Sequence, residues 1–375
     1  MRSDQPRRVL WGIKGLGNGG AEQLLVSSAH AATPGAASYR VVYLLPWKDA
    51  LVDTLEAEGV ATTCLGARSS WDLRWMARLR RELRAQPVDV VHVHSPLVAA
   101  GARLVVRTLP RADRPALVTT EHNVWSSHQR LTRFANAATA GLDDITVAVS
   151  AAVRDSMAPR VRRRTRVVRY GVDTDAVLAA AEGARAAVRS ELGIASDEIV
   201  VGTVANIRRT KAYPDLLEAA RVVIDAVPNV RFVAVGQGPH EAAVRLRHAE
   251  LGLGDRFILT GYRADAVRVM AAFDVFCLAS HHEGLPIAMM EALTLGLPVV
   301  ATDVGGIHEL LAGGYDAVLV PASRPDLLAK ALVDVVTDDA ARHAMAEAAR
   351  ARRPDLGVAN AVRQMEEFYA EVARR

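Results

Sequence analysis

Short apolar runs alternate along the chain with longer segments whose apolar residues recur every three or four positions. Many of the short runs are continuously apolar, as in strands that are buried on both faces of a parallel sheet. The helical segments between them complete βαβ units, so the pattern predicts an α/β fold with parallel sheets covered by helices. The expected strands are Arg8–Trp11, Arg40–Leu45, Asp89–His94, Ala116–Thr120, Ile145–Val149, Ile199–Val204, Val230–Val235, Phe257–Thr260, Asp274–Ala279, Pro298–Ala301 and Ala317–Val320.

The alternation pauses around residues 157–175, where the sequence is basic and contains Pro and Gly, and then restarts. The length of 375 residues suits two domains, since one domain commonly has about 100–200 residues. We place one Rossmann-like domain at residues 1–169 and a second at residues 170–355. Residues 356–375 predict an amphipathic helix that returns to the N-terminal domain, with one apolar face formed by Val358, Val362, Met365 and Phe368/Tyr369.

Composition and charge narrow the class of protein. Half of the residues are hydrophobic and the net charge is +4, which is typical of a globular protein. Cys64 and Cys277 lie in apolar runs, which predicts buried free thiols, and no Cys/His cluster has zinc spacing. The N-terminus lacks the apolar run of a signal peptide and no stretch is long enough for a transmembrane helix, so we expect a cytoplasmic protein. No nucleic-acid-binding motif is present.

A glycine-rich loop follows the first expected strand. Gly15, Gly17 and Gly20 satisfy G-x-G-x-x-G and lead into a helix, which would let the backbone and the helix N-terminus approach a phosphate. A dinucleotide site would also need an acid at the end of the second strand, and the first acid there is Asp49, which lies beyond it. A tight strand-to-helix turn without a ligand would have the same sequence.

Two glutamates follow the expected strand Asp274–Ala279. Glu283 lies at the loop–helix junction and Glu291 lies eight residues further on, about two helical turns, so both can line one side. Each acid could hold a vicinal diol, one on a hexose and one on a ribose, while Gly284 and Leu285 offer backbone N–H groups at the helix start. Two solvated surface acids would have the same spacing, but the apolar residues between them indicate a packed helix.

A basic loop after the strand Ile199–Val204 contains Arg208, Arg209 and Lys211. These cations could neutralise a departing diphosphate. An ordinary basic surface loop would look the same without the two glutamates.

Together these motifs resemble the retaining GT-B glycosyltransferases of family four, the glycosyl transferases group 1, over nearly the whole chain. The most specific motif is the E-x7-E segment HHEGLPIAMMEA. The motifs follow one another in the family's order: GGAE (Gly19–Glu22), DVVHVHS (Asp89–Ser95), TTEHN (Thr119–Asn123), VSAAV (Val149–Val153), YGVD (Tyr170–Asp173), VANIRRTKAYPDLLEA, VGQGP (Val235–Pro239), EGLPIAMMEAL and VGGIHEL (Val304–Leu310).

The resemblance implies roles for residues of the second domain. Glu283 matches the acid that contacts hydroxyls of the donor sugar, and Glu291 matches the acid that binds the ribose diol. Lys211 matches the lysine that contacts the donor diphosphate. Family members commonly carry an arginine five or six residues before this lysine; here Asn206 stands five before it and Arg208 three before it, and we assign both to the donor.

In the first domain, Gly20, with Gly19 beside it, matches the glycine whose backbone approaches the phosphates. His122 matches the histidine near the sugar and the reacting centre. The family needs no metal, so we expect no metal and no cofactor, with the nucleotide-sugar as a substrate. The acceptor should bind near the strand ends of this domain, where the candidates are His92, His94, Asn123 and Trp125.

The segment Trp71–Leu83 is basic and amphipathic. It predicts a helix that packs its apolar stripe on the sheet, and a weak contact with an anionic membrane surface is the alternative. The arginine-rich tract Arg160–Arg169 is interpreted as a solvated linker.

The sequence thus predicts a retaining, metal-independent hexosyltransferase-type enzyme. It would move a sugar from a nucleoside-diphosphate sugar to an acceptor hydroxyl, with UDP favoured over GDP and the donor held in a cleft between the domains. The alternatives are a nucleotide-sugar epimerase, an inactive nucleotide-sugar-binding subunit and, more remotely, an NAD dehydrogenase.

Overall fold

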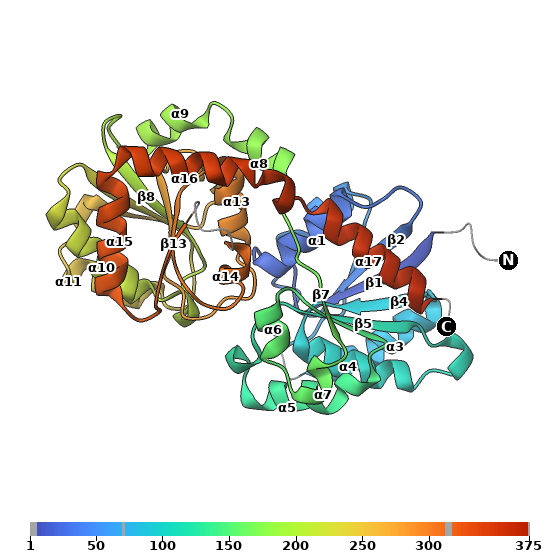
Figure 1. Cartoon of the computed structure of the whole chain (residues 1–375). Coiled ribbons are helices and arrows are strands. Elements are labelled where there is room, and N and C mark those ends of the chain that lie inside the picture. Colours follow the sequence, from blue (N-terminus) through green and yellow to red (C-terminus); the bar gives the residue numbers. More distant parts are fainter. Residues whose placement is uncertain (1–5, 70–71, 312–316, 374–375) are drawn as a thin grey trace. The chain divides into compact units, whose positions relative to one another are not determined.

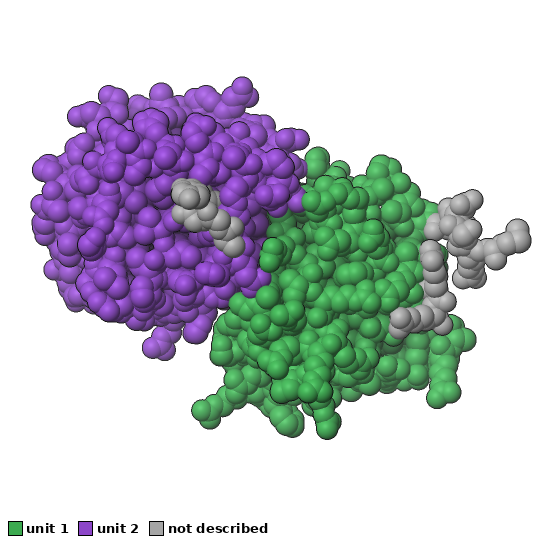
Figure 2. All heavy atoms as spheres, viewed as in Figure 1, with its two compact units in different colours: residues 1–171, 358–375 green, residues 172–357 purple. Residues whose placement is uncertain are grey.

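A computed structural model of the chain describes residues 6–69, 72–311 and 317–373 (Figure 1). The chain divides into two compact units (Figure 2). Unit 1 contains residues 1–171 and 358–375, and unit 2 contains residues 172–357. Each unit holds one parallel β-sheet with helices packed against it, so the predicted α/β class is confirmed.

Unit 1 has a seven-stranded sheet in the order β3-β2-β1-β4-β5-β6-β7. Its strands are β1 (Arg7–Ile13), β2 (Ala37–Tyr43), β3 (Ala61–Cys64), β4 (Val90–Val93), β5 (Ala116–Glu121), β6 (Ile145–Ala148) and β7 (Thr165–Val167). Its α-helices are α1 (Gly20–His30), α2 (Val52–Ala57), α3 (Arg74–Ala85), α4 (Pro96–Arg107), α5 (Arg130–Thr139), α6 (Ala151–Asp155), α7 (Pro159–Arg162) and α17 (Ala359–Val372).

Unit 2 has a six-stranded sheet in the order β10-β9-β8-β11-β12-β13. Its strands are β8 (Ile199–Val204), β9 (Val230–Val235), β10 (Phe257–Gly261), β11 (Val275–Leu278), β12 (Val299–Thr302) and β13 (Ala317–Val320). Its α-helices are α8 (Thr174–Ala181), α9 (Ala184–Glu191), α10 (Tyr213–Ala226), α11 (Glu241–Glu250), α12 (Ala266–Met270), α13 (Ile287–Leu295), α14 (Ile307–Leu310), α15 (Pro325–Thr337) and α16 (Asp339–Ala351).

Both sheets have the doubly wound topology. In each unit the chain builds three strands towards one edge and then returns to the far side of its first strand, so the order reverses between β1 and β4 and between β8 and β11. Ligands of such sheets bind beyond the carboxyl ends of the strands at this reversal. The loops after these four strands are therefore where a site is expected.

All eleven strands expected from the sequence are present, and two further strands, β3 and β7, were missed. Both are short edge strands of unit 1, and edge strands need no continuous apolar run because only part of their surface is buried. The interpretation of Arg160–Arg169 as a solvated linker is wrong, because the tract contains the end of α7 and all of β7. Cys64 ends β3 and is exposed, which corrects its expected burial, whereas Cys277 in β11 is buried; both thiols are free.

Aspartates at the amino ends of strands hold neighbouring strands in register. Asp89, just before β4, accepts from the backbone N–H of Arg8 in β1 over 2.9 Å. Asp274, just before β11, accepts in the same way from Val200 in β8 over 2.7 Å. The two units therefore fix their central strand pair with the same device, at the sheet edge opposite the ligand-binding end.

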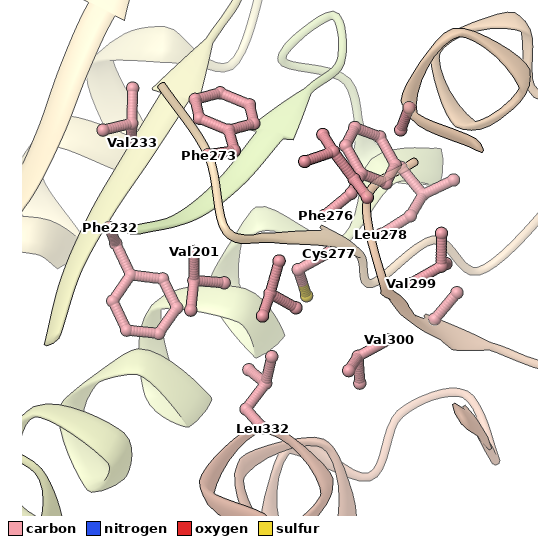
Figure 3. Close-up of a cluster of buried hydrophobic side chains, with 14 of the residues drawn as sticks. Val201, Phe232, Val233, Phe273, Phe276, Cys277, Leu278, Val299, Val300 and Leu332 are labelled. Atoms are coloured by element: carbon pink, nitrogen blue, oxygen red, sulfur yellow. The ribbon is translucent and has the colours of Figure 1, made fainter. Parts of the chain in front are cut away.

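The core of unit 2 shows why its strands are apolar throughout. Pairing places Phe232, Val201, Cys277 and Val300 on the face of the sheet that meets Leu332 of α15 (Figure 3). The alternate residues of the same strands face the other helices, and all of these side chains are buried. Burial on both faces requires continuous hydrophobic runs, as the sequence predicted.

The C-terminal helix α17 belongs to unit 1, where Val362, Met365 and Tyr369 are buried as its amphipathic pattern predicted. Glu366 on the same helix accepts hydrogen bonds from the Thr33 amide and the Tyr39 hydroxyl. Figure 1 shows α17 running beside α1 over the strands β1 and β2.

Candidate active site

The loops after β8 and β11 bring together a lysine and a glutamate in unit 2. Lys211 ends the short 3-10 helix η4 (Arg209–Lys211) after β8, and Glu283 lies in the loop after β11. The Lys211 Nζ donates to Glu283 Oε1 over 2.5 Å. Because β8 and β11 flank the reversal of strand order, the pair lies where doubly wound sheets bind their ligands.

Glu283 is only 6% exposed, and its side chain is fixed in place. Ser280 Oγ donates to the same Oε1 over 2.5 Å. The backbone at Glu283 packs closely against the backbone at Gly305. Gly305 has a φ of +57°, and a Cβ on it would lie 1.9 Å from the Glu283 carbonyl oxygen. Only glycine satisfies both conditions. Oε2 of Glu283 accepts no hydrogen bond from a described residue and is therefore left to accept one from a ligand.

Backbone amides lie ahead of helix α13. The amides of Gly284 and Leu285 donate to no acceptor among the described residues, while the Gly284 carbonyl accepts from Gly306 N over 3.0 Å. Unpaired amides at a helix start favour an anion or a hydroxyl oxygen. The sequence prediction that these two residues offer N–H groups beside Glu283 agrees with this geometry.

Glu291 lies in the second turn of α13 and is half-buried. Its carboxyl group has no hydrogen bond or ion pair with any described residue, and burial raises its pKa to about 7. A carboxyl group that is partly desolvated and unpaired gains free energy when a ligand donates hydrogen bonds to it. This gain makes Glu291 a candidate binding group.

The loop between β8 and α10 carries Asn206 and Arg208 on its exposed side. The Arg208 guanidinium has no partner among the described residues. Ala212 closes the loop in the left-handed region, with a φ of +48°, although it is not glycine. The Ala212 side chain is buried, so packing holds this strained turn. The turn thereby fixes the backbone position of Lys211, the residue before it.

In unit 1, the glycine loop leads directly into α1. Gly19 is the extended N-cap residue of this helix and Gly20 is its first residue. The carboxylate of Glu22 lies against the N-cap, 2.3 Å from where a Cβ of Gly19 would stand. The amides of Gly20 and Ala21 have no acceptor among the described residues. Two amides of the first turn are thus left without an acceptor, as the phosphate-binding interpretation requires.

Three histidines follow one another through the carboxyl ends of β4 and β5. His92 Nδ1 lies 2.6 Å from the Tyr369 hydroxyl and its Nε2 lies 2.7 Å from Thr120 Oγ1. His94 Nδ1 lies 3.1 Å from His122 Nε2. Burial lowers the pKa of His92 to about 3 and that of His122 to about 4, and it lowers the pKa of His94 well below the ordinary value. All three rings are therefore neutral at physiological pH.

The four acceptor candidates differ in accessibility. His92 is 1% exposed and uses both ring nitrogens inside the unit, and His94 and Trp125 are also buried. These three cannot touch an acceptor in this arrangement, because their side chains lie inside the packed unit. Asn123 is exposed, next to the partly exposed His122, and is the candidate that the structure leaves accessible.

Helix α3 corresponds to the basic amphipathic segment, whose first residue, Trp71, lies outside the described residues. Trp75, Leu79 and Leu83 are buried in the core of unit 1, so the prediction that the stripe packs on the sheet is confirmed. None of the helices in the described parts of the chain has the length and apolar character needed to cross a bilayer. Within the same residues, no three His, Cys, Asp or Glu side chains gather as metal ligands would.

Comparison with known proteins places both units in one group. Residues 184–352 match the family of glycosyl transferases group 1, and residues 19–176 match glycosyltransferase family 4. A 2-deoxystreptamine N-acetyl-D-glucosaminyltransferase from Streptomyces fradiae is 30% identical over 345 residues, which cover 84% of this chain and 78% of the relative. This chain belongs to the group 1 glycosyltransferases.

A further relative and a solved structure are similar to this glycosyltransferase over most of its length. A UDP-Gal:alpha-D-GlcNAc-diphosphoundecaprenol alpha-1,3-galactosyltransferase from Escherichia coli is 28% identical over 81% of each chain. HepE from Anabaena, solved in complex with UDP and glucose, superposes with a TM-score of 0.85 at 19% identity, over 97% of this chain and 100% of that one. The fold is therefore GT-B.

Sequence reasoning missed several residues that shape the glycosyltransferase site. Ser280 fixes Glu283, and its position three residues before the acid was a usable local signal. Thr120, Tyr170 and Tyr369 surround the histidines. Tyr369 had no local signal, because its partner His92 lies 277 residues away in the sequence.

Proposed function

We propose that this glycosyltransferase moves a hexosyl group from a UDP-sugar to an acceptor hydroxyl with retention of the anomeric configuration, without a metal. The bond between the anomeric carbon and the diphosphate oxygen breaks, and a bond to the acceptor oxygen forms on the same face of the sugar. The acceptor proton passes to the leaving phosphate oxygen. The observation that carries the proposal is the Lys211–Glu283 pair at the strand reversal, with the unpaired Glu291 eight residues further on, inside α13, which begins at Ile287.

In this proposal unit 2 binds the donor. Lys211 and Arg208 stabilise the negative charge that grows on the diphosphate as it leaves. Oε2 of Glu283 accepts from hydroxyls of the sugar, and the amides of Gly284 and Leu285 hold the same end of the donor. The remaining donor contacts are the ribose diol on Glu291 and the exposed Asn206.

Glu283 acts as a binding group rather than as a nucleophile. Its Oε1 already accepts from Lys211 and from Ser280, both at 2.5 Å, so the charge of the carboxylate is engaged before a substrate arrives. Hydrogen bonds of this kind stabilise the ionised form and reduce its tendency to form a covalent bond. Attack by the acceptor from the leaving-group side needs no covalent sugar–enzyme intermediate.

Unit 1 carries its own set of proposed substrate contacts. The helix start at Gly19 and Gly20 approaches the donor phosphates through backbone N–H groups. His122 is a neutral imidazole and contacts the sugar near the reacting carbon through the ring nitrogen that His94 does not occupy. Asn123, beside it, is proposed to contact the acceptor.

A weak contact with an anionic membrane surface also remains part of the proposal, but it moves from α3 to α5. The side chains of Leu131 and Phe134 on α5 are 59% and 71% exposed. Arg130 directly precedes Leu131 and Arg133 directly precedes Phe134 on the same helix, and neither guanidinium has a partner among the described residues. An exposed apolar pair next to free cations suits the interface of a bilayer that contains acidic lipids.

The experiment that tests the enzymatic proposal is a calorimetric titration of the whole protein with UDP, GDP and NAD, followed by product analysis with UDP-sugars. We expect UDP to bind and NAD to give no heat. Binding of GDP alone would overturn the choice of donor base. An altered sugar nucleotide formed without any acceptor would instead identify an epimerase, and bound UDP-sugar that is neither hydrolysed nor transferred to any acceptor hydroxyl would identify an inactive binding subunit.

A further inference from the structure

A chain of buried contacts connects His122 to the C-terminal helix of the same unit. Tyr369 on α17 reaches His92 in β4 over 2.6 Å. The ring of His92 packs on that of His94, with centroids 4.0 Å apart, and His94 reaches His122 over 3.1 Å. The residues thus form a series from α17, through β4, to the loop after β5.

Donor counting fixes the direction of the hydrogen bonds around Tyr369. Trp11 Nε1 can only donate, and it points to the Tyr369 hydroxyl oxygen over 3.4 Å. The assignment in which each donor has an acceptor among the described residues has the hydroxyl accept from Trp11 and donate its own hydrogen to His92 Nδ1. His92 must then carry its proton on Nε2 and donate it to Thr120 Oγ1 at 2.7 Å. The hydroxyl of Tyr369 thereby sets one tautomer and one ring orientation of His92.

His94 passes a change in the orientation of the His92 ring on to His122, because few other polar contacts hold the His94 ring in place. Its Nε2 is buried and makes no hydrogen bond with a described residue, so its polar tie is the contact with His122. The cavity beside the two rings, lined by Trp11, Tyr39 and Tyr170 among others, has a volume of about 10 Å³. A space of that size holds at most one water molecule, so a ring that loses its neighbour's support can tilt only slightly.

We propose that Tyr369 is a positioning residue for His122, acting through His92 and His94, and that the C-terminal helix thereby sets the geometry at the reacting centre. The inference rests on the proposed role of His122 beside the donor sugar. A small tilt of His94 moves the whole ring of His122, including the Nδ1 that is proposed to contact the sugar, and misplacement of a catalytic contact by a fraction of an ångström reduces the rate of transfer.

The test compares Tyr369→Phe with Tyr39→Phe. Both variants remove one tyrosine hydroxyl that lies against or on α17, but the Tyr39 hydroxyl donates to Glu366 and touches no histidine. We expect Tyr369→Phe to lower kcat about tenfold, with an unchanged Kd for UDP, because the proposed donor-diphosphate contacts of unit 2 are untouched. The control should stay within about twofold of the wild type.

Nitrogen NMR spectra of the histidine rings provide the readout that a general loss of stability would not move. Tyr369→Phe should shift the signals of His92 and of His122, and Tyr39→Phe should leave both in place. Thr120→Val, which removes the acceptor of His92 Nε2–H without changing shape, should shift the same signals. Equal losses of kcat in Tyr369→Phe and Tyr39→Phe, or an unmoved His122 signal in Tyr369→Phe, would overturn the inference. If the wild type transfers no sugar at all, the proposed function fails, while the NMR spectra still test the series of contacts.

Discussion

The two units share one topology but prepare opposite electrostatic environments at the same place. In unit 2 the loops after the central strands hold a lysine, a glutamate engaged with it and a second glutamate without a partner. In unit 1 the corresponding region holds three histidines that burial keeps neutral. The same strand order therefore supports a charged half-site and an uncharged one.

The difference follows from where the side chains start. His92 lies within β4, so both its neighbours in the sheet and helix α17 cover it, and the charged form is disfavoured. Lys211 and Arg208 start from a loop beyond the end of β8, where water still reaches them. A diphosphate that carries negative charge fits the second environment, and a sugar that exchanges neutral hydrogen bonds fits the first.

Two carboxyl groups with raised pKa values, one buried and one half-buried, sharpen the contrast. Burial raises the pKa of Glu121 in unit 1 and of Glu291 in unit 2, each to about 7. Glu121 accepts a hydrogen bond from the Asn136 amide inside the network that Arg103 organises, so it serves the structure of unit 1. Glu291 has no partner among the described residues and is free to serve a ligand.

The largest expected effect concerns the stability of unit 1. Arg103 is fully buried and forms a two-pronged pair with Asp143, at 2.7 and 2.6 Å. Arg103→Leu leaves Asp143 buried without its cation, which costs about 3–5 kcal/mol of unfolding free energy. Arg185→Leu in unit 2 is the control, because Asp274 keeps Arg189 and stays partly exposed; its cost should be below about 1 kcal/mol. Thermal and urea unfolding measure both, and equal losses would contradict the contrast between the two pairs.

The next largest effect concerns the charged half-site. Lys211→Ala should reduce sugar transfer roughly 10²- to 10³-fold, because the leaving diphosphate loses a preorganised cation. Arg209→Ala, in the same loop, removes an exposed cation that is not among the proposed donor contacts, and it should change the rate less than about threefold. Steady-state transfer assays compare the two variants. A Lys211→Ala enzyme that keeps a tenth of its activity would remove the lysine from the proposed chemistry.

Glu291→Gln should weaken UDP binding about 10- to 100-fold, since hydrogen bonds from ribose hydroxyls to an ionised carboxylate contribute about 1.5–3 kcal/mol.

The pKa of Glu291 is raised from its ordinary 4.5 to about 7, so its contribution to the stability of the fold is full below pH 4.5 and is lost as the pH rises through 7. Without a ligand, the free energy of unfolding of Glu291→Gln should therefore increase relative to that of the wild type as the pH rises from 5 to 8.

Calorimetry across the same pH range provides the matching ligand measurement. The ribose diol donates to the ionised form of Glu291, so the affinity of the wild type for UDP should rise more steeply between pH 6 and pH 8 than that of Glu291→Gln. Parallel curves for the two proteins would remove Glu291 from the binding site. Glu121→Gln is the control in unit 1, because its carboxyl group is also raised to a pKa of about 7 but is engaged with Asn136.

The part of the fold and site that local sequence determines could be predicted. Strands such as Val230–Val235 are buried on both faces, so they are apolar at every position, and the alternation with helices gives the α/β class. Glu283 and Lys211 follow such strands within a few residues, so their place beyond a strand end could be inferred, and the resemblance to a family supplied their roles.

The rest depends on contacts between distant segments. The edge strands β3 and β7 pair on one side only, so their composition does not mark them. The burial of His92 depends on Tyr369 and Thr120, which no local pattern links to it, so the sequence could not show that both of its ring nitrogens are engaged inside unit 1. The exposure of Cys64 has the same cause, because a short apolar run does not show that its strand lies at an edge.

The smallest expected effect tests whether the outer surfaces of the two units differ as their sites do. Leu131→Ser/Phe134→Ser on α5 should weaken binding to vesicles with acidic lipids about three- to tenfold, because two exposed apolar side chains can no longer enter the interface. Leu246→Ser is the control, since this leucine is equally exposed on α11 of unit 2. Vesicle flotation at low and high salt makes the comparison, and salt should weaken the binding of the wild type. Equal binding by both variants would remove the membrane contact from α5. Binding to neutral vesicles as strong as to acidic ones would show that Arg130 and Arg133 contribute nothing to it.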